Sequence, residues 1–186
     1  LAFPRGSSLG RELFDQTSEL IRSPFTRDLL RMSEQIPNYE TFIEQTNQSL
    51  IKVVEFLHAQ PKIGKVYWAY QSDNRKTFEK QAGPDRPGCV ASFEISGSFE
   101  TFYDRLEMLK SPSFGTHFSI CCPYTYLAHY SLLKTKDGRK KLDRAKLTPN
   151  LLRLSVGNEN PDQIMETIED ALRASWNSGK WGSNPY

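Results

Sequence analysis

The chain has 186 residues, of which 38% are hydrophobic and 25% are charged, and its length predicts one domain, or one domain with an appendage. Its 24 Lys and Arg against 22 Asp and Glu leave a formal net charge of +2, which argues against a nucleic-acid-binding protein. No apolar run approaches the roughly 18–20 residues that span a bilayer, no signal peptide opens the chain, and its 3 cysteines suit a reducing compartment. We therefore expect a soluble, cytoplasmic protein with no membrane partner.

The first part of the chain, residues 1–36, predicts helices whose apolar residues follow no clear period. Those residues are Leu13, Phe14, Leu20, Ile21, Leu29, Leu30 and Met32. Such a segment suits a helical remnant whose apolar side chains face an absent domain. After Pro37, with Asn38 as N-cap, the sequence predicts a strong helix, because apolar residues recur at helical spacing. This stripe consists of Tyr39, Phe42, Ile43, Leu50, Val53, Val54 and Leu57.

From Ile63 onward, strands and helices alternate. The strands are predicted at 66–70, 89–95, 118–122 and 151–156. Helices are predicted at 98–108 and from Pro161 onward, where Ile164, Ile168, Ala171 and Leu172 face inward. Residues 124–133 favour a helix. The tail from Ser175 is expected to be only partly ordered. The polar stretches 71–88 and 134–144 read as turns or solvated loops. This pattern predicts an α/β fold of the α+β type, with about four mainly antiparallel strands and helices on one face.

Arg153 is the leading candidate for a binding residue. It interrupts the apolar run Leu-Leu-Arg-Leu-Ser-Val-Gly that begins at Leu151 and predicts a buried strand. A guanidinium is costly to bury unless it meets an anion, and its planar fork suits a carboxylate or a phosphate. The alternative is an ion pair with an acidic side chain of this chain.

Four further stretches of the sequence, taken in chain order, resemble motifs of one enzyme family. They are Asn47 on the long helix, Pro61–Trp68, Pro87–Ile95, and Ser113-Phe114-Gly115-Thr116 with Ser119 and His129 downstream. With the run around Arg153 they resemble the C-terminal part of the Cys/Met metabolism family of fold-type-I pyridoxal-phosphate enzymes, which includes cystathionine gamma-synthases, cystathionine lyases and O-acetylhomoserine sulfhydrylases. The chain departs from that family at Ala69, where proline is usual, and at Pro87, which replaces a glycine. The Ser113 motif also lacks its second glycine and has Phe118 in place of a glutamate.

The resemblance implies a domain organisation and a function. Residues 37–186 would be the small domain of such an enzyme, and residues 1–36 a connector to a missing large domain. The parent would use pyridoxal 5'-phosphate for γ-replacement or for β/γ-elimination on a sulfur amino acid or its homoserine-ester precursor, in a homotetramer. Arg153 would bind the substrate's α-carboxylate, and Ser113 would lie beside substrate and cofactor, contributing mainly through its backbone.

The family's cofactor lysine has no counterpart in this sequence. The Ser-x-Thr-Lys segment is absent, and Thr135-Lys136 lies in a polar run unsuited to a desolvated lysine. We therefore expect the chain alone to be inactive and to bind no cofactor covalently. The alternative is a non-catalytic, separated or degenerate small domain that acts in binding or in subunit association. The sequence does not choose between synthase, lyase and sulfhydrylase.

Two other clusters predict no function. The residues His117, Cys121, Cys122 and His129 are of zinc-ligating types, but adjacent cysteines on a strand point to opposite faces and no C-x-x-C occurs. We expect packed cysteines and a surface histidine instead. The basic run from Lys134 to Arg144 lacks the aromatic neighbours that single-stranded nucleic acid requires, so we expect a solvated segment.

Overall fold

A computed structural model describes residues 6–17, 24–71 and 74–177 of the chain. The chain divides into two units, Leu1–Tyr39 and Glu40–Tyr186. None of the helices in the described ranges is long and apolar enough to cross a membrane.

The first unit is helical, as predicted. It contains α1 (Ser8–Thr17), α2 (Thr26–Gln35) and the 3-10 turn η1 (Ile36–Asn38). Neither α1 nor α2 buries a residue, and the side chains of Phe14, Leu29 and Leu30 are exposed. The predicted positions Leu20 and Ile21 lie outside the described residues.

The predicted N-cap at Asn38 is wrong. An N-cap residue has non-helical dihedral angles and precedes the first helical residue. Here Asn38 ends η1, and Tyr39 after it already has helical dihedrals, with φ −62° and ψ −46°. The chain therefore passes from η1 into the next helix without a capped break.

A five-stranded sheet forms the centre of the second unit. The order of elements is α3 (Tyr39–Ala59), β1 (Ile63–Trp68), α4 (Arg75–Ala82), β2 (Val90–Ile95), α5 (Phe99–Arg105), β3 (Leu109–Lys110), β4 (Ile120–Pro123), α6 (Tyr124–Leu133), α7 (Lys136–Arg144), β5 (Leu151–Ser155) and α8 (Pro161–Asn177). The strands lie in the order β1-β2-β5-β4-β3, and every pairing is antiparallel except that of β3 with β4. The predicted mainly antiparallel sheet is confirmed, with five strands rather than about four, because β3 has only 2 residues and leaves no period to detect.

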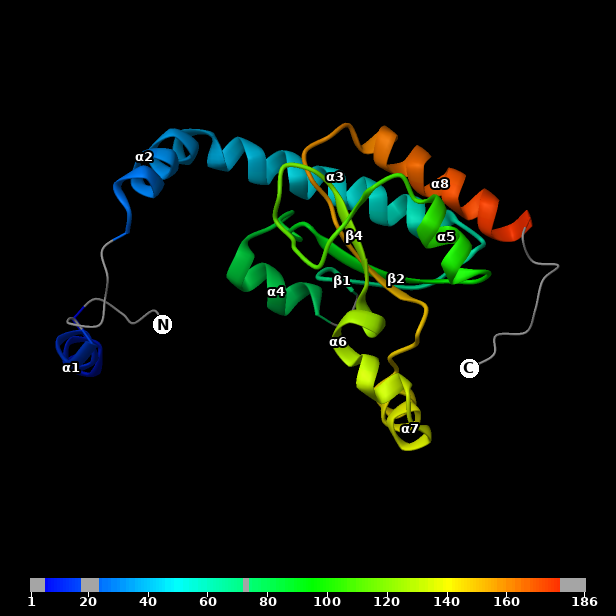
Figure 1. Ribbon diagram of the computed structural model, residues 1–186. Coiled ribbons are helices and arrows are strands. Elements are labelled where there is room, and N and C mark those ends of the chain that lie inside the picture. Colours follow the sequence, from blue (N-terminus) through cyan, green and yellow to red (C-terminus); the bar gives the residue numbers. More distant parts are fainter. Residues whose placement is uncertain (1–5, 18–23, 72–73, 178–186) are drawn as a thin grey trace. The chain divides into compact units, whose positions relative to one another are not determined.

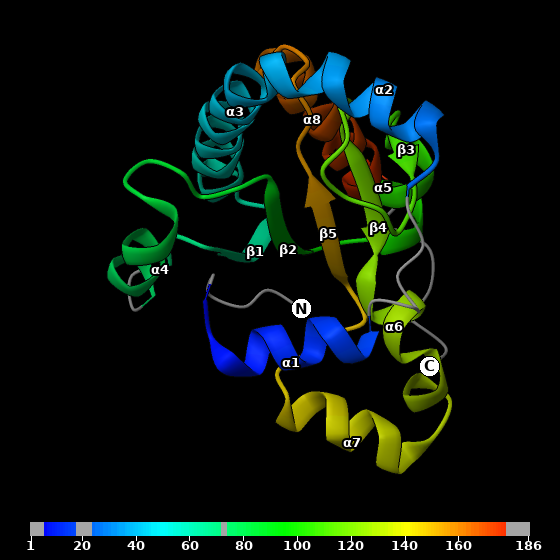
Figure 2. The same ribbon diagram turned by 90° about the vertical axis from the view of Figure 1, so that its left-hand side faces the viewer.

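The hydrophobic core lies between one face of this sheet and the helices α3, α5 and α8 (Figures 1 and 2). On β2 the side chains alternate, so that Ala91, Phe93 and Ile95 are buried in the core. Leu152 and Leu154 of β5 face the same way. The predicted inward residues of α8 are confirmed, as is the α3 stripe from Leu50 onward: these are Leu50, Val53, Val54, Leu57, Ile164, Ile168, Ala171 and Leu172. The stripe's first member, Tyr39, is instead exposed.

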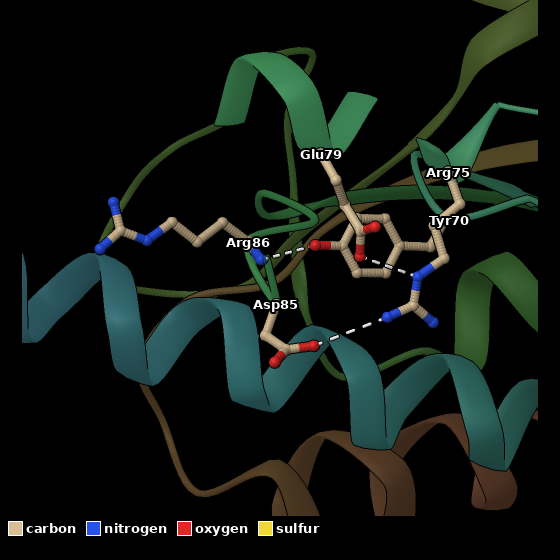
Figure 3. A network of polar contacts seen from close by, with 5 residues as sticks. All are labelled: Tyr70, Arg75, Glu79, Asp85 and Arg86. Carbon is tan, nitrogen blue, oxygen red and sulfur yellow. Dashed lines mark hydrogen bonds and ion pairs between the residues drawn. The ribbon is translucent and has the colours of Figure 1, made fainter. Parts of the chain in front are cut away.

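The segment 71–88 contains the helix α4 rather than only a turn. Its sequence carries no apolar period because α4 buries no residue. Local polar contacts hold it instead (Figure 3). The Arg75 guanidinium lies 4.5 Å from the centre of the Tyr70 ring and pairs with Glu79 at 2.9 Å, and the backbone N–H of Arg86 donates to the Tyr70 hydroxyl at 2.7 Å.

The basic run 134–144 is also helical, which corrects the predicted loop. Thr135 caps α7, its hydroxyl accepting a hydrogen bond from the N–H of Gly138 at 3.0 Å. Gly138 lies against α6, where an added Cβ would stand 2.6 Å from the Leu132 Cα. Leu142 alone supplies a buried apolar side chain to α7, which is too few to give a helical period in the sequence. The two helices α6 and α7 extend from one end of the sheet (Figure 1).

Candidate substrate-binding site

Arg153 lies in the middle of β5, on the sheet face that points away from the core. Its neighbours in the register are Ser92 of β2 and Cys122 of β4. Because β5 is the third of five strands, Arg153 stands at the centre of the sheet. The strand order that decides this comes from long-range pairing, which the sequence of β5 does not contain.

The Arg153 guanidinium is held by backbone carbonyls and aromatic rings. Its Nη2 donates to the carbonyl oxygen of Pro112 and, at 3.4 Å, to that of Ser113. The ring centres of Phe114 and Tyr124 lie 5.5 and 6.0 Å from its Cζ. No acidic side chain within the described ranges forms an ion pair with Arg153. The group is thus oriented while its positive charge stays available to an anion.

Ser113 enters this site through its backbone. Its side chain is exposed, its carbonyl oxygen contacts Arg153, and its N–H donates to Ser111 Oγ at 3.3 Å. The structure therefore brings the two predicted site residues together, although they are 40 positions apart. Phe114 and Tyr124 are additional residues that sequence reasoning missed as partners of the guanidinium.

The loop 112–119, which carries these carbonyl groups, runs beside β5 and the turn after it. Gly115 has a φ of +70°, a conformation that favours glycine, and its N–H donates to Ser155 Oγ at 3.1 Å. At Gly157 an added Cβ would stand 2.6 Å from the His117 carbonyl oxygen. The Ser-Val-Gly that follows Arg153 and Leu154 thus allows the loop to approach closely.

Glu159 holds the far end of loop 112–119. Its carboxylate accepts hydrogen bonds from the N–H and, at 3.0 Å, from the hydroxyl of Ser119. The same hydroxyl accepts the N–H of Gly157 at 3.0 Å. Sequence reasoning missed Glu159, and its only signal was its place directly after the Arg153 run.

Asn47 has a structural contact rather than a place at Arg153. It is buried in α3, where its Nδ2 donates to the Ile43 carbonyl at 2.7 Å. Its Oδ1 accepts the N–H of Gly88 at 2.7 Å. The side chain therefore ties α3 to the turn that leads into β2.

The two adjacent cysteines point to opposite faces of β4. Cys121 belongs to the hydrophobic core, and Cys122 lies beside Arg153 on the other face. His117 packs on Phe42 with the ring centres 4.5 Å apart. Within the described ranges, no three His, Cys, Asp or Glu side chains gather as metal ligands would.

Burial controls the chemistry of both β4 thiols. It raises the pKa of the Cys121 thiol strongly, and the neighbouring Cys122 adds to that rise. Burial also raises the pKa of Cys122, and the charge of Arg153 offsets part of this rise. Both side chains therefore favour the neutral thiol.

These thiols should react more slowly than Cys89, which is half-buried. Only the thiolate attacks an alkylating reagent, so iodoacetamide at mildly alkaline pH should modify Cys89 at least about tenfold faster than Cys121 or Cys122. Timed quenching and peptide mass spectrometry measure the three rates, and the same reaction in denaturant, where they should converge, is the control. Equal rates in the folded chain would contradict the burial of the β4 thiols.

No lysine that the structure describes is fully buried. Lys136 follows the α7 cap and is exposed, and the exposed Lys110 donates its Nζ to the Asp104 carbonyl at 3.4 Å. A lysine that binds pyridoxal phosphate covalently needs a desolvated position. The described residues therefore fit a substrate carboxylate, at Arg153, but do not fit a covalent cofactor anchor.

Curated relatives share much of this chain. It is 33% identical over 150 residues to an L-2-amino-4-chloropent-4-enoate dechlorinase/desaturase of Streptantibioticus cattleyicolor, covering 80% of this chain and 30% of the relative. It is 28% identical over 151 residues to a cystathionine gamma-synthase of Neurospora crassa, covering 80% of this chain and 23% of the relative. The chain thus spans less than a third of the length of either relative.

Solved structures share the fold. A cystathionine gamma lyase, CalE6, of Micromonospora echinospora matches with a TM-score of 0.75 and 22% identity over 91% of this chain and 44% of its own. A cystathionine gamma synthase of Xanthomonas oryzae pv. oryzae matches with a TM-score of 0.75 and 18% identity, over 94% of this chain and 45% of its own. The model of the Cys/Met metabolism PLP-dependent enzymes matches residues 40–173, which is well over half of the sequence. The chain belongs to this pyridoxal-phosphate-dependent family.

Proposed function

We propose that the chain is the C-terminal part of a pyridoxal-phosphate-dependent enzyme of sulfur amino-acid metabolism, and that Arg153 binds the substrate's α-carboxylate. In this proposal residues 37–186 form the small domain, and residues 1–36 connect it to a large domain outside this chain. The parent is a cytoplasmic homo-oligomer that carries out γ-replacement or β/γ-elimination. Its relatives support the substrate class, because one is named a cystathionine gamma-synthase and another acts on an L-2-amino acid.

The observation that carries this proposal is the state of Arg153. Its guanidinium is oriented by the Pro112 and Ser113 carbonyls and lacks an acidic partner within the described ranges. An internal bidentate ion pair would have to break before a carboxylate could bind, which would weaken binding. A guanidinium oriented by carbonyl oxygens and aromatic rings, and not by a carboxylate of the described residues, keeps the charge that the ligand needs.

The contribution of this chain to the reaction is binding and orientation. A two-point contact between the guanidinium fork and a carboxylate restricts the rotation of the bound amino acid, and Ser113 borders it through its backbone. When bound in such an enzyme, pyridoxal phosphate serves as an electron sink for the substrate. Its covalent anchor would come from residues outside this chain.

The first experiment mixes the purified chain with pyridoxal phosphate and reduces the mixture with borohydride. We expect no stoichiometric adduct at any one lysine, because none of the described lysines is fully buried. Peptide mapping measures the adducts. The first position to inspect is Lys110, the last residue of β3, because it lies shortly before loop 112–119. A stoichiometric adduct there, absent from a Lys110→Arg control, would contradict the assignment of the anchor to another domain.

The second experiment separates this function from the alternative of a non-catalytic binding or association domain. The longer protein that contains this chain, loaded with pyridoxal phosphate, is assayed with O-acylhomoserine and a thiol, with cystathionine and with methionine. Turnover of one of them supports the enzyme. A longer protein that lacks a cofactor lysine and turns over none of them supports the alternative.

A further inference from the structure

A row of hydrogen bonds joins loop 112–119 to the segment that contains Arg153. The N–H of Gly115 donates to Ser155 Oγ at 3.1 Å, and the N–H of Asn158 donates to the His117 carbonyl at 3.1 Å. Glu159 and Ser119 complete the row at its far end. The carbonyl groups that orient Arg153 therefore belong to a loop whose position depends on side chains up to Glu159.

Within this row, Glu159 makes the contact with the largest expected effect. A carboxylate that accepts both an N–H and an O–H forms charge-assisted hydrogen bonds, which are stronger than neutral ones. The donor side of this contact is also shielded from water, because Ser119 is only 4% exposed. The Ser119 hydroxyl donates to Glu159 while it accepts from Gly157, so each bond polarises the other.

We propose that Glu159 is a positioning residue of the carboxylate site, which acts through Ser119 and loop 112–119 to set the carbonyl groups that orient Arg153. This proposal deepens the proposed function, since it concerns the same site. It assigns Glu159 no contact with substrate or cofactor. Loss of the Glu159–Ser119 contact should loosen the loop and release the Arg153 guanidinium from the Pro112 and Ser113 carbonyls.

The test uses the full chain and needs no ligand. Phenylglyoxal modifies arginine guanidinium groups, and mass spectrometry gives the rate at each arginine separately. In Glu159→Gln, which keeps the side-chain shape but loses the charge and one acceptor oxygen, Arg153 should react at least about threefold faster, the factor expected for one lost hydrogen bond. Hydrogen exchange at the Ser119 and Gly157 amides should accelerate in parallel.

Two variants complete the design. Ser119→Ala removes the hydroxyl that bridges Glu159 and Gly157, and it should accelerate the Arg153 reaction in the same direction. Glu166→Gln is the matched control, because Glu166 is an exposed residue of α8 outside the row, and it should change neither rate. The reactivity of Arg173, also on α8, reports general loosening and should stay constant in all three variants.

The outcomes are distinct. Faster amide exchange at Ser119 with an unchanged Arg153 rate would overturn the positioning role and leave a local contact. Unchanged exchange and unchanged Arg153 reactivity would overturn the contact itself. Because neither readout involves an amino acid or a cofactor, failure here leaves the proposed function standing.

In the longer protein, Glu159→Gln should raise KM for the amino acid at least about threefold, with a smaller change in kcat. A fall in kcat alone would contradict the proposal.

Discussion

Replacing Arg153 by lysine in the longer, pyridoxal-phosphate-loaded protein should lower kcat/KM for the amino-acid substrate at least tenfold, or about 1.4 kcal/mol. Lysine keeps the positive charge but loses the planar fork that binds a carboxylate at two points. It also loses the stacking of the guanidinium near Phe114 and Tyr124. Steady-state kinetics measure the change, with whichever of the candidate substrates the longer protein turns over. The fall should be accompanied by weaker inhibition by simple carboxylic acids.

The matched control for this variant is Arg86→Lys. Arg86 is exposed, and its guanidinium points away from the other residues of the Tyr70 network (Figure 3). Its backbone N–H, which lysine retains, makes the contact with Tyr70. Kinetics should therefore stay unchanged. Unchanged kinetics in Arg153→Lys as well would return Arg153 to a purely structural role.

Replacing Phe93 by alanine should lower the free energy of unfolding of the chain by about 3–5 kcal/mol. Phe93 is 1% exposed at the centre of the core and meets Phe102 edge-on, with ring centres 6.2 Å apart. Its removal loses apolar burial and leaves a cavity between the sheet and α5. Since whole domains are stable by only about 5–15 kcal/mol, the midpoint of a urea transition should shift markedly.

The control for the core variant is Phe25→Ala. This substitution removes the same aromatic ring, but from a side chain that is 81% exposed. It should change the free energy of unfolding by no more than about 0.5 kcal/mol. Similar losses in the two variants would contradict the location of the core on the face that contains Phe93.

Sequence periodicity was sufficient wherever an element has one buried face. The α3 stripe from Leu50 and the inward residues of α8 were predicted, because a helix that packs on a core must repeat its apolar residues. It failed for α4 and α7, since the first buries no residue and the second buries few. Their stability comes from local contacts such as Arg75–Glu79 and Thr135–Gly138.

For the candidate site, too, some features could be predicted from the sequence and others only from the tertiary structure. The sequence by itself showed that Arg153 is unusual, because a guanidinium within an apolar strand run is costly to bury. The family resemblance, and not the residue pattern, implied a role for Ser113. The sequence also determined that the chain lacks the Ser-x-Thr-Lys segment.

Only the tertiary structure decided what surrounds Arg153. Strand alternation places the guanidinium away from the core, but the position of β5 at the centre of the sheet depends on its pairing with β2 and β4. The contacts of Arg153 with Pro112, and of Glu159 with Ser119, join residues about 40 positions apart. Such contacts produce no repeating pattern of residues in the sequence, because each joins one residue pair from two segments that only the folded sheet brings together.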